Sequence, residues 1–272
     1  MKTLSLCSGI GGLDLGLERA NFKIAAMCEV DAYCRSILSE RWPGIPIYDG
    51  VESVEIFRGQ YDCIAAGFPC QGLSVNGKQL GLKDSRSALW FDILRLVNVG
   101  RPTWCIFENS PMLLVKEDGD IVIHGLEAAG YSCWPLVVSA KNVGAPHVRR
   151  RAFVIAKLAD PDDRRSGKDQ QPAKLRAEGF VESPGDRGQA EASPRKEERL
   201  HRWPAPPGES QGRDEPPRAK PRLGGDAHGL SPRLESRIRK ERLRSLGNAV
   251  VPQVAEAVGR AVMAVHGMER RR

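Results

Sequence analysis

Short apolar runs alternate with amphipathic stretches over the first 157 residues of the chain. The apolar runs predict strands over Thr3–Cys7, Ile24–Glu29, Ile45–Tyr48, Cys63–Gly67, Trp104–Glu108, Cys133–Ser139 and Ala152–Ala156. Apolar residues at helical spacing predict helices over Leu13–Arg19, Ala32–Glu40 and Leu89–Val99. Strands that alternate with helices indicate an α/β fold, in which helices cover both faces of a mostly parallel sheet.

The pattern changes near Leu158. From there to about Arg242 the chain is rich in Pro, Gly, Arg and Glu and has little apolar periodicity. One interpretation is a disordered or loosely folded insertion. The other is a small ordered module, whose core would use Trp203, Leu223 and Leu230.

Helical periodicity returns at Val250–Val265 and predicts an amphipathic helix. The chain is therefore expected to have three parts. Residues 1–157 form a cofactor-binding and catalytic domain, residues 158–242 form a partly irregular region, and residues 243–272 return to complete the first domain.

Composition narrows the class of protein. The 272 residues are 41% hydrophobic, enough for one α/β domain with a small second one, and the net charge of +7 favours an anionic partner such as nucleic acid. Seven cysteines without a CxxC pair argue against a disulfide framework and a zinc site, which fits a reducing cytoplasm. We expect no metal. The chain has no apolar stretch approaching 18 residues and its first residues lack a signal-peptide core, so we expect no membrane association.

A cysteine follows the strand predicted at Cys63–Gly67, in the tetrapeptide Phe68-Pro69-Cys70-Gln71. The carboxyl ends of strands are where open α/β sheets bind ligands. Cys70 is therefore a candidate nucleophile. The alternative is that Cys70 is a buried packing residue, the commoner role of an isolated cysteine.

Three features along the chain suit a cofactor that contains a nucleoside. Ser8–Gly12 (SGIGG) is a glycine-rich turn between a strand and a helix, although it lacks the full GxGxxG spacing of dinucleotide sites. Glu29 ends the next strand, where an acid can bond a ribose hydroxyl. Asp49 follows the third strand and is placed to contact a base; alternatively it only forms a turn before Gly50.

Polar residues also follow the fifth strand. A desolvated Glu108 carboxyl would be protonated and could donate to a ring nitrogen. The alternative is a helix cap, for which Asn109-Ser110-Pro111 is well suited. Arg149 and Arg151 project to one side of an extended segment and could hold a phosphate or a carbonyl oxygen. The alternative is an ordinary solvated arginine run.

Taken in order, these residues resemble the DNA cytosine-5 methyltransferases. SLCSGIGGLDLGL is similar to the first motif of that family, GFPCQGLSVNGK to its PCQ motif, Asp84–Trp90 to the segment after it, ENS to its ENV motif, NVGAPHVRRR to GxPQxRxR and LGNAVVPQVAEAVG to GNSVxPxV. The resemblance covers residues 3–157 and 243–265. It implies a doubly wound, Rossmann-like domain that uses S-adenosylmethionine, with a small irregular target-recognition insertion.

The resemblance also implies roles for individual residues. Cys70 would attack C6 of cytosine, Glu108 would hold the N3 edge, and Arg149 and Arg151 would supply positive charge, with Arg151 near O2. Pro69, Gln71 and Asn109 would support the site. The cofactor would be bound by Ser8, Gly9, Ile10, Gly11, Gly12, Glu29, Val30, Asp49, Gly50, Gly67, Pro69, Leu89, Asn248 and Val250. DNA would be contacted by Ser74, Lys78, Arg86 and His147.

The chain departs from the family pattern at several positions. Ser5 stands in place of an aspartate and Cys7 in place of a phenylalanine that packs on adenine, so both substitutions are expected to weaken cofactor binding. His147 stands in place of a glutamine of the active-site loop, and Ser110 replaces a valine, a minor change.

The interval between the last two motifs corresponds to the target-recognition region of the family. Its basic residues suit phosphate contacts, which give affinity without sequence information, and give no basis for choosing base-reading arginines. We expect ordered loops facing DNA at Trp203–Arg213 and Gly229–Leu243, and disorder is the alternative for residues 162–199.

The predicted function is methylation of cytosine C5 in a specific duplex DNA sequence, with the target base flipped out of the helix. The length leaves no room for an endonuclease domain, so we expect either an orphan, phage-like enzyme or the modification half of a restriction system with a separate endonuclease. We expect a cytoplasmic monomer. One alternative is a tRNA cytosine-5 methyltransferase. The other is a catalytically silent DNA-binding protein, and the presence of Cys70, Glu108 and Arg151 together argues against this second alternative. The chain contains no [DN]PP[YF] motif, which argues against an amino-methylating enzyme.

Overall fold

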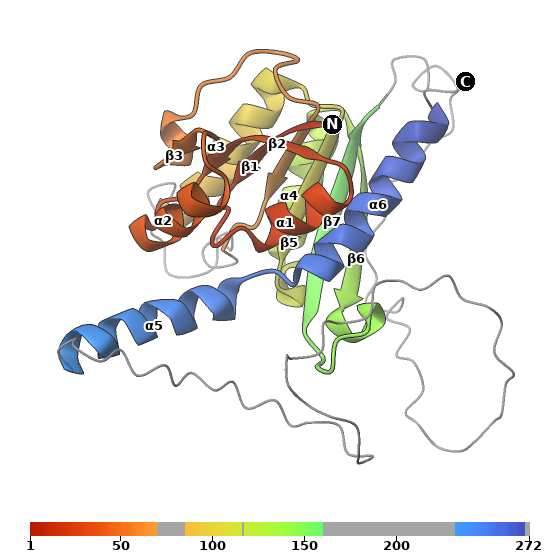
Figure 1. The fold of residues 1–272 in the computed structure, drawn as a ribbon. Coiled ribbons are helices and arrows are strands. Elements are labelled where there is room, and N and C mark those ends of the chain that lie inside the picture. Colours follow the sequence, from red (N-terminus) through yellow and green to blue (C-terminus); the bar gives the residue numbers. More distant parts are fainter. Residues whose placement is uncertain (70–84, 116, 160–231, 270–272) are drawn as a thin grey trace, which may run out of the picture.

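The computed structural model describes residues 1–69, 85–115, 117–159 and 232–269, with only the backbone for helix residues 85–88 and 232–239 (Figure 1). The expected disorder at 162–199, the loop at Trp203–Arg213 and the module around Trp203, Leu223 and Leu230 lie outside these ranges.

Within the described ranges, seven strands form one sheet in the order β3-β2-β1-β4-β5-β7-β6. The strands are β1 (Lys2–Leu6), β2 (Lys23–Cys28), β3 (Ile47–Tyr48), β4 (Cys63–Ala66), β5 (Trp104–Asn109), β6 (Tyr131–Ser139) and β7 (Arg150–Leu158). The first five strands run parallel, and β7 pairs antiparallel with both β5 and β6. The prediction of an α/β fold with a mostly parallel sheet is confirmed.

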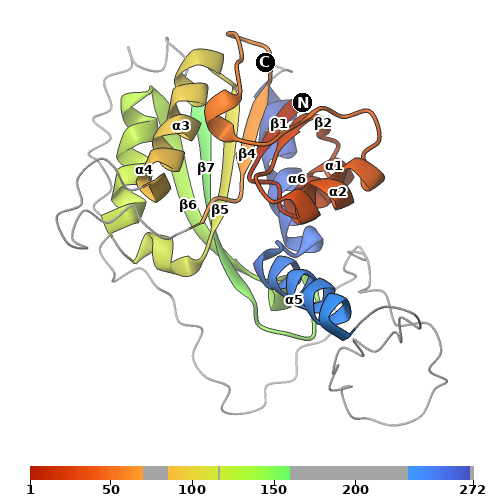
Figure 2. The same cartoon turned by 90° about the vertical axis from the view of Figure 1, so that its left-hand side faces the viewer.

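Helices cover both faces of the sheet (Figure 2). On one side lie α1 (Gly12–Arg19), α2 (Ala32–Arg41) and α6 (Pro252–Glu269), and on the other lie α3 (Ser85–Gly100) and α4 (Glu117–Ala128). The strands alternate accordingly. In β5, Cys105 and Phe107 pack with α3 and α4, whereas Trp104 and Ile106 pack with α1 and α6. Both faces of the central strands are therefore buried, which explains why these strands read as continuous apolar runs.

Two glycines bring the end of the chain against its beginning. A Cβ atom on Gly16 of α1 would lie 2.3 Å from the carbonyl oxygen of Pro252, and one on Gly12 would lie 2.4 Å from the carbonyl oxygen of Val250. Neither position therefore has room for a larger residue. Close packing of α1 on α6 places the residues before α6 beside the glycine-rich turn.

Two helices were not predicted. Gly229–Leu243 was expected to be a loop, but α5 runs from Pro232 to Asn248, so that expectation is wrong from residue 232 onward. The helix is rich in Arg, Glu and Leu, which favour helix formation, and has too few apolar residues to show a periodic face. The boundary placed at residue 242 falls inside α5. The other helix is α4, whose first turn carries Glu117, Asp118 and Asp120.

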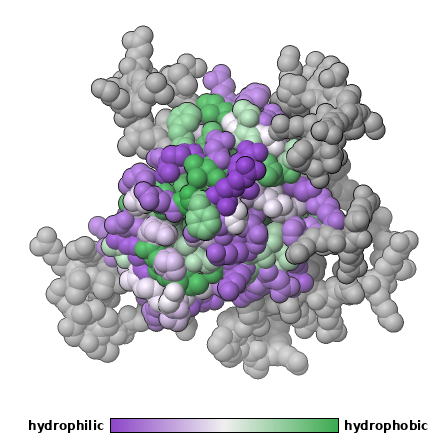
Figure 3. All heavy atoms as spheres, turned by 90° about the horizontal axis from the view of Figure 1, so that it is seen from above, coloured by the Kyte–Doolittle hydropathy of each residue, from purple (hydrophilic) through white to green (hydrophobic). Residues whose placement is uncertain are grey.

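Three short 3-10 helices complete the described structure: η1 (Val51–Ser53), η2 (Pro111–Leu114) and η3 (Ala140–Val143). Seen from above, the surface of the described part of the chain intersperses hydrophilic groups with smaller hydrophobic ones (Figure 3). Among the helices described, none combines the length and apolar character required to span a membrane.

Candidate active site

A cavity of about 750 Å³ opens at the carboxyl ends of β1, β2, β4 and β5. The same cavity is reached by the segment between α5 and α6. It brings together fourteen of the residues expected at the site: Ser8, Gly9, Gly12, Glu29, Val30, Gly50, Gly67, Pro69, Leu89, Glu108, Asn109, Arg151, Asn248 and Val250.

Backbone amides hold the Glu29 carboxylate in place. The amide of Gly9 donates to Oε2 at 2.7 Å, and the amide of Asp31 donates to Oε1 at 2.8 Å. Each carboxylate oxygen retains a further lone pair. Glu29 also lines the cavity, so it can accept hydrogen bonds from a pair of ligand hydroxyls.

The glycine-rich turn contributes some of its residues to the cavity. Ser8, Gly9 and Gly12 line it, whereas Ile10 and Gly11 do not. Gly9 has a φ of +57°, and nothing lies within 4 Å of where its Cβ would be. A ligand can therefore approach the backbone closely at Gly9.

The structure places Asp49 differently from the expected base contact. Asp49 is exposed and does not line the cavity, whereas the next residues Gly50, Val51 and Glu52 do. Other lining residues that the sequence did not single out are Leu13, Cys28, Asp31, Cys34, Phe68, Arg244, Ser245 and Ala249. Several of them are direct neighbours of predicted residues, so extending each motif by one or two positions would have found them.

The buried Glu108 and the partly buried Arg151 form an ion pair in the lining of the cavity. The Arg151 Nε atom lies 2.7 Å from Glu108 Oε1, so the two side chains are in direct ion-pair contact. Glu108 is 6% exposed. Burial raises the pKa of Glu108 to about 7, against the opposing charges of Arg151 and Arg149. Glu108 can therefore be either protonated or ionised near neutral pH.

Asn109 ties β5 to the segment that leads to Cys70. Its Nδ2 atom donates to the carbonyl oxygen of Phe68 at 2.9 Å, and its Oδ1 atom accepts from the amide of Ser110 at 2.8 Å. The Phe68 ring packs against Trp90 and Phe107. The backbone just before Pro69 is thus fixed by both a buried hydrogen bond and aromatic packing.

Several predicted residues lie outside the described ranges. These are Cys70, Gln71, Ser74 and Lys78, and the side chain of Arg86 is not described either. His147 is exposed and does not line the cavity.

Arg149 lies beside the cavity and not in its lining. Its Nη2 atom donates to the carbonyl oxygens of Gly247 at 2.5 Å and Ala249 at 2.9 Å. Burial, with the like charge of Arg151, lowers the pKa of Arg149. The observed contacts of Arg149 connect the start of β7 to the segment between α5 and α6.

Two of the departures from the family pattern lie in or beside the cavity. Cys7 lines it, and burial raises the pKa of its thiol. The Ser5 hydroxyl is buried and lies 2.9 Å from the hydroxyl of Ser8. No group of three or more His, Cys, Asp or Glu residues is placed to hold a metal ion in the part of the chain that the structure describes.

Comparison with known proteins shows what the chain resembles. A family model described as C-5 cytosine-specific DNA methylase matches residues 1–190. Type II methyltransferase M2.BsuMI of Bacillus subtilis strain 168 is 36% identical over 60% of this chain and 44% of its own length. Type II methyltransferase M.NgoBI of Neisseria gonorrhoeae is 32% identical over 57% of this chain and 50% of its own length. The chain thus spans half or less of each of these relatives.

A solved structure supports the same fold. The Dnmt2 methyltransferase of S. pombe has a TM-score of 0.51 at 19% sequence identity, over 64% of this chain and 57% of its own. At that identity the likeness concerns the fold alone.

Proposed function

The chain belongs to the C-5 cytosine-specific DNA methylase family, and from this premise we propose that it methylates C5 of cytosine in duplex DNA, using S-adenosylmethionine and a covalent bond from Cys70 to C6. The observation that carries the proposal is the buried Glu108 beside Arg151, in the cavity that Pro69 also lines. Pro69 directly precedes Cys70 in the chain.

The shape and chemistry of the cavity fit S-adenosylmethionine. Glu29 would accept from the ribose hydroxyls, Gly9 and Gly12 would face the amino-acid end, and Asn248 and Val250 would close the methionine side. When bound, S-adenosylmethionine supplies a methyl group that its sulfonium makes electrophilic.

The residues of the chain would prepare the cytosine. The Cys70 thiolate forms a bond to C6, and ring electrons move toward C5 and the N3 edge. A protonated Glu108 donates to N3 and stabilises the charge that develops there, and Arg151 stabilises O2. After C5 has gained its methyl group, a base removes the C5 proton, and the electrons left in the C5–H bond expel Cys70 from C6.

The thiol of Cys70 must be ionised to attack. An unperturbed thiol is only a few per cent ionised near neutral pH, so a positive field favours the reaction. Arg149 and Arg151 are the residues proposed to supply that field.

DNA would reach this site with the target base flipped out of the duplex, because the cavity lies within the protein and a stacked base is out of reach. Ser74, Lys78, Arg86 and His147 are the proposed DNA contacts, and the net charge of +7 supports binding to phosphates. The proposal also includes a cytoplasmic location and a monomeric state. The enzyme would either act alone, as an orphan, or have a separate cognate endonuclease.

Covalent trapping tests the proposal directly. The protein, with S-adenosylmethionine, is incubated with duplexes of varied sequence that contain 5-fluorocytosine, and the Cys70→Ala variant serves as the control. We expect an adduct that survives denaturation with the wild type and none with the variant. No adduct in any sequence context would contradict the mechanism. Tritiated methyl transfer to duplex DNA and to tRNA then identifies the nucleic acid, since the proposal requires DNA to be the better substrate.

A further inference from the structure

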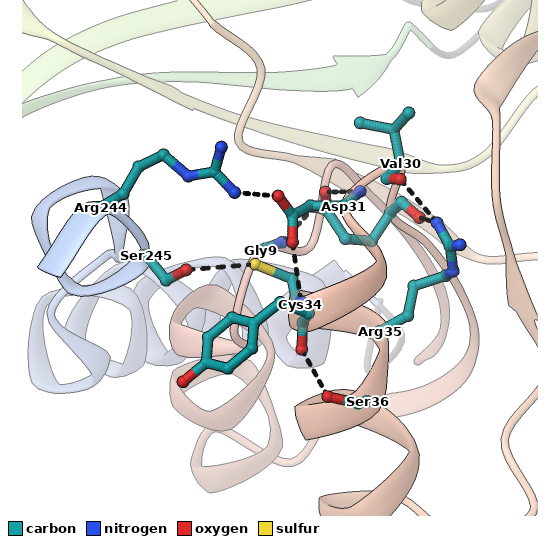
Figure 4. Close-up of polar contacts among 10 residues, drawn as sticks. Gly9, Val30, Asp31, Cys34, Arg35, Ser36, Arg244 and Ser245 are labelled. Atoms are coloured by element: carbon teal, nitrogen blue, oxygen red, sulfur yellow. Dashed lines mark hydrogen bonds and ion pairs between the residues drawn. The ribbon is translucent and has the colours of Figure 1, made fainter. Parts of the chain in front are cut away.

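Helix α5 contacts the loop that carries the cofactor-binding carboxylate (Figure 4). The Arg244 guanidinium, from the last part of α5, forms an ion pair with the Asp31 carboxylate. One residue further on, the Ser245 hydroxyl lies 3.5 Å from the Cys34 Sγ atom, within hydrogen-bond distance for sulfur. All four residues line the cavity, so this contact lies across one wall of the cofactor site.

Hydrogen bonds link the residues of the loop on the other side of this contact. Arg35 donates to the carbonyl oxygens of Glu29 at 2.9 Å and Val30 at 2.6 Å. The Asp31 amide holds the Glu29 carboxylate, and the Asp31 side chain accepts from the amide of Cys34 at 3.0 Å as the cap of α2. Asp31 therefore joins α5, through its side chain, to the carboxylate expected to bind ribose.

The segment after α5 is held from a second direction. Arg149 donates to the carbonyl oxygens of Gly247 and Ala249, which lie between Ser245 and Val250. Arg149 directly precedes β7, so these hydrogen bonds fix the C-terminal end of α5 to the sheet. The contact with Asp31 joins the same end of α5 to the loop that follows Glu29.

The two bonds of this contact differ in strength and exposure. The Arg244 side chain is 59% exposed and that of Asp31 is 25% exposed, whereas Ser245 and Cys34 are buried. An exposed ion pair contributes little and is screened by salt.

We propose that Arg244 and Ser245 form a latch, closed on Asp31 and Cys34, which holds the C-terminal end of α5 against the wall of the cofactor cavity and slows the release of S-adenosylmethionine. The proposal rests on the proposed function, because it takes the cavity to bind that cofactor. Arg244 and Ser245 are positioning residues: they act by keeping the wall of the cavity closed. In wild-type protein, higher salt should speed release by weakening the ion pair.

The test is the dissociation rate of tritiated S-adenosylmethionine, measured by rapid filtration after a chase of unlabelled cofactor, without DNA. The variants are Arg244→Gln, Asp31→Asn, their double variant and Ser245→Ala. Asp31→Asn keeps the helix cap, because Asn caps as well as Asp. Arg242→Gln removes the same charge from an exposed position on the same helix and is the matched control.

We expect Arg244→Gln to speed release about two- to five-fold, in keeping with the strength of exposed ion pairs. The double variant should release the cofactor no faster than the faster of its two single variants, and Ser245→Ala should also speed release. Arg242→Gln should match the wild type. Raising sodium chloride from about 50 to about 500 mM should speed release from the wild type but not from Arg244→Gln.

The outcomes separate the latch from the function. Equal release rates for Arg244→Gln and the wild type, or effects of the two single variants that multiply in the double variant, would overturn the latch and leave the proposed function standing. A wild type that binds no S-adenosylmethionine would overturn the proposed function, and the latch with it.

Discussion

Glu108 and Arg151 meet at 2.7 Å across the antiparallel pair β5 and β7, with the pKa of Glu108 raised to about 7 by its burial. The carboxyl of Glu108 can therefore keep its proton near neutral pH although a guanidinium lies beside it. This arrangement suits a group that must donate to a ring nitrogen, and it gives the site a measurable dependence on pH.

Replacing Glu108 with Gln is expected to reduce methyl transfer about 10²- to 10⁴-fold, because the amide cannot transfer a proton. Single-turnover transfer of a tritiated methyl group to duplex DNA measures this. The exposed Glu55→Gln variant is the control and should retain wild-type activity. A Glu108→Gln variant that turns over at the wild-type rate would remove Glu108 from the mechanism.

The same substitution should stabilise the folded protein at high pH. The raised pKa means that the folded protein holds the Glu108 proton more tightly than the unfolded chain. The free energy of unfolding therefore falls as the pH rises from about 4.5 to about 7, by up to about 3 kcal/mol. The free energy of unfolding of Glu108→Gln should not fall in this way, because Gln does not ionise. Urea unfolding should show it to be the more stable protein at about pH 8 and similar to the wild type at about pH 4.5, and a pH-independent difference would contradict the raised pKa.

The rate of methyl transfer should be bell-shaped in pH. The rising limb reports ionisation of the attacking thiol, and the falling limb reports loss of the Glu108 proton above about pH 7. Rates measured from about pH 6 to about pH 9.5 should show both limbs in the wild type. The residual activity of Glu108→Gln should lack the falling limb. Its persistence in that variant would assign the limb to another group.

Asp14 gives a second test of buried charge. The residue is buried beneath the glycine-rich turn, its carboxylate oxygens have no hydrogen-bond partner among the described residues, and burial raises its pKa to about 6. Ionised Asp14 therefore destabilises the fold increasingly from about pH 4 to about pH 6. Asp14→Asn should be more stable than the wild type at about pH 7.5, by about 1–3 kcal/mol in urea unfolding.

The matched control for Asp14 is the exposed Asp120→Asn. The stability difference between Asp14→Asn and the wild type should shrink as the pH falls to about 4, whereas Asp120→Asn should show no such trend. A difference that stays constant with pH would show that burial does not keep Asp14 protonated.

Asn109→Ala should impair the nucleophile. The variant loses the 2.9 Å hydrogen bond to Phe68, which fixes the backbone just before Pro69 and Cys70. We expect adduct formation with 5-fluorocytosine to slow about 10- to 100-fold, since small misplacements of reacting groups have large effects on rate. Asn98→Ala, which removes a comparable bond to the Leu94 carbonyl on α3, should not slow it. Equal rates for the two variants would contradict a positioning role for Asn109.

The sequence was informative where local chemistry determines structure. The strands were predicted close to their observed bounds, because residues such as Ile64 and Ile106 are buried on a sheet that is covered on both faces. Helix α5 was missed because its polar composition shows no apolar face, and its position depends on contacts with Asp31 and Cys34 far away in the chain.

The site shows the same division between local and long-range information. Glu29, Glu108 and Gly9 could be chosen because each lies at or just beyond the carboxyl end of a strand, where ligands of parallel sheets bind. The contacts of Arg149 could not be predicted from the sequence. Its partners are the backbone carbonyl oxygens of Gly247 and Ala249, and every residue type has such an oxygen. The sequence also could not show that Asp49 lies outside the lining of the cavity, because the end of a strand does not determine which way the following residue points.

The close fit of Gly12 and Gly16 against the start of α6 has a consequence for synthesis on the ribosome. The glycine-rich turn and most of the sheet are translated well before Val250, which lines the cavity, and before α6, which packs on α1. Until then, α1 exposes the apolar surface that α6 later covers. Such a chain would depend on chaperones, or on fast elongation, during that interval.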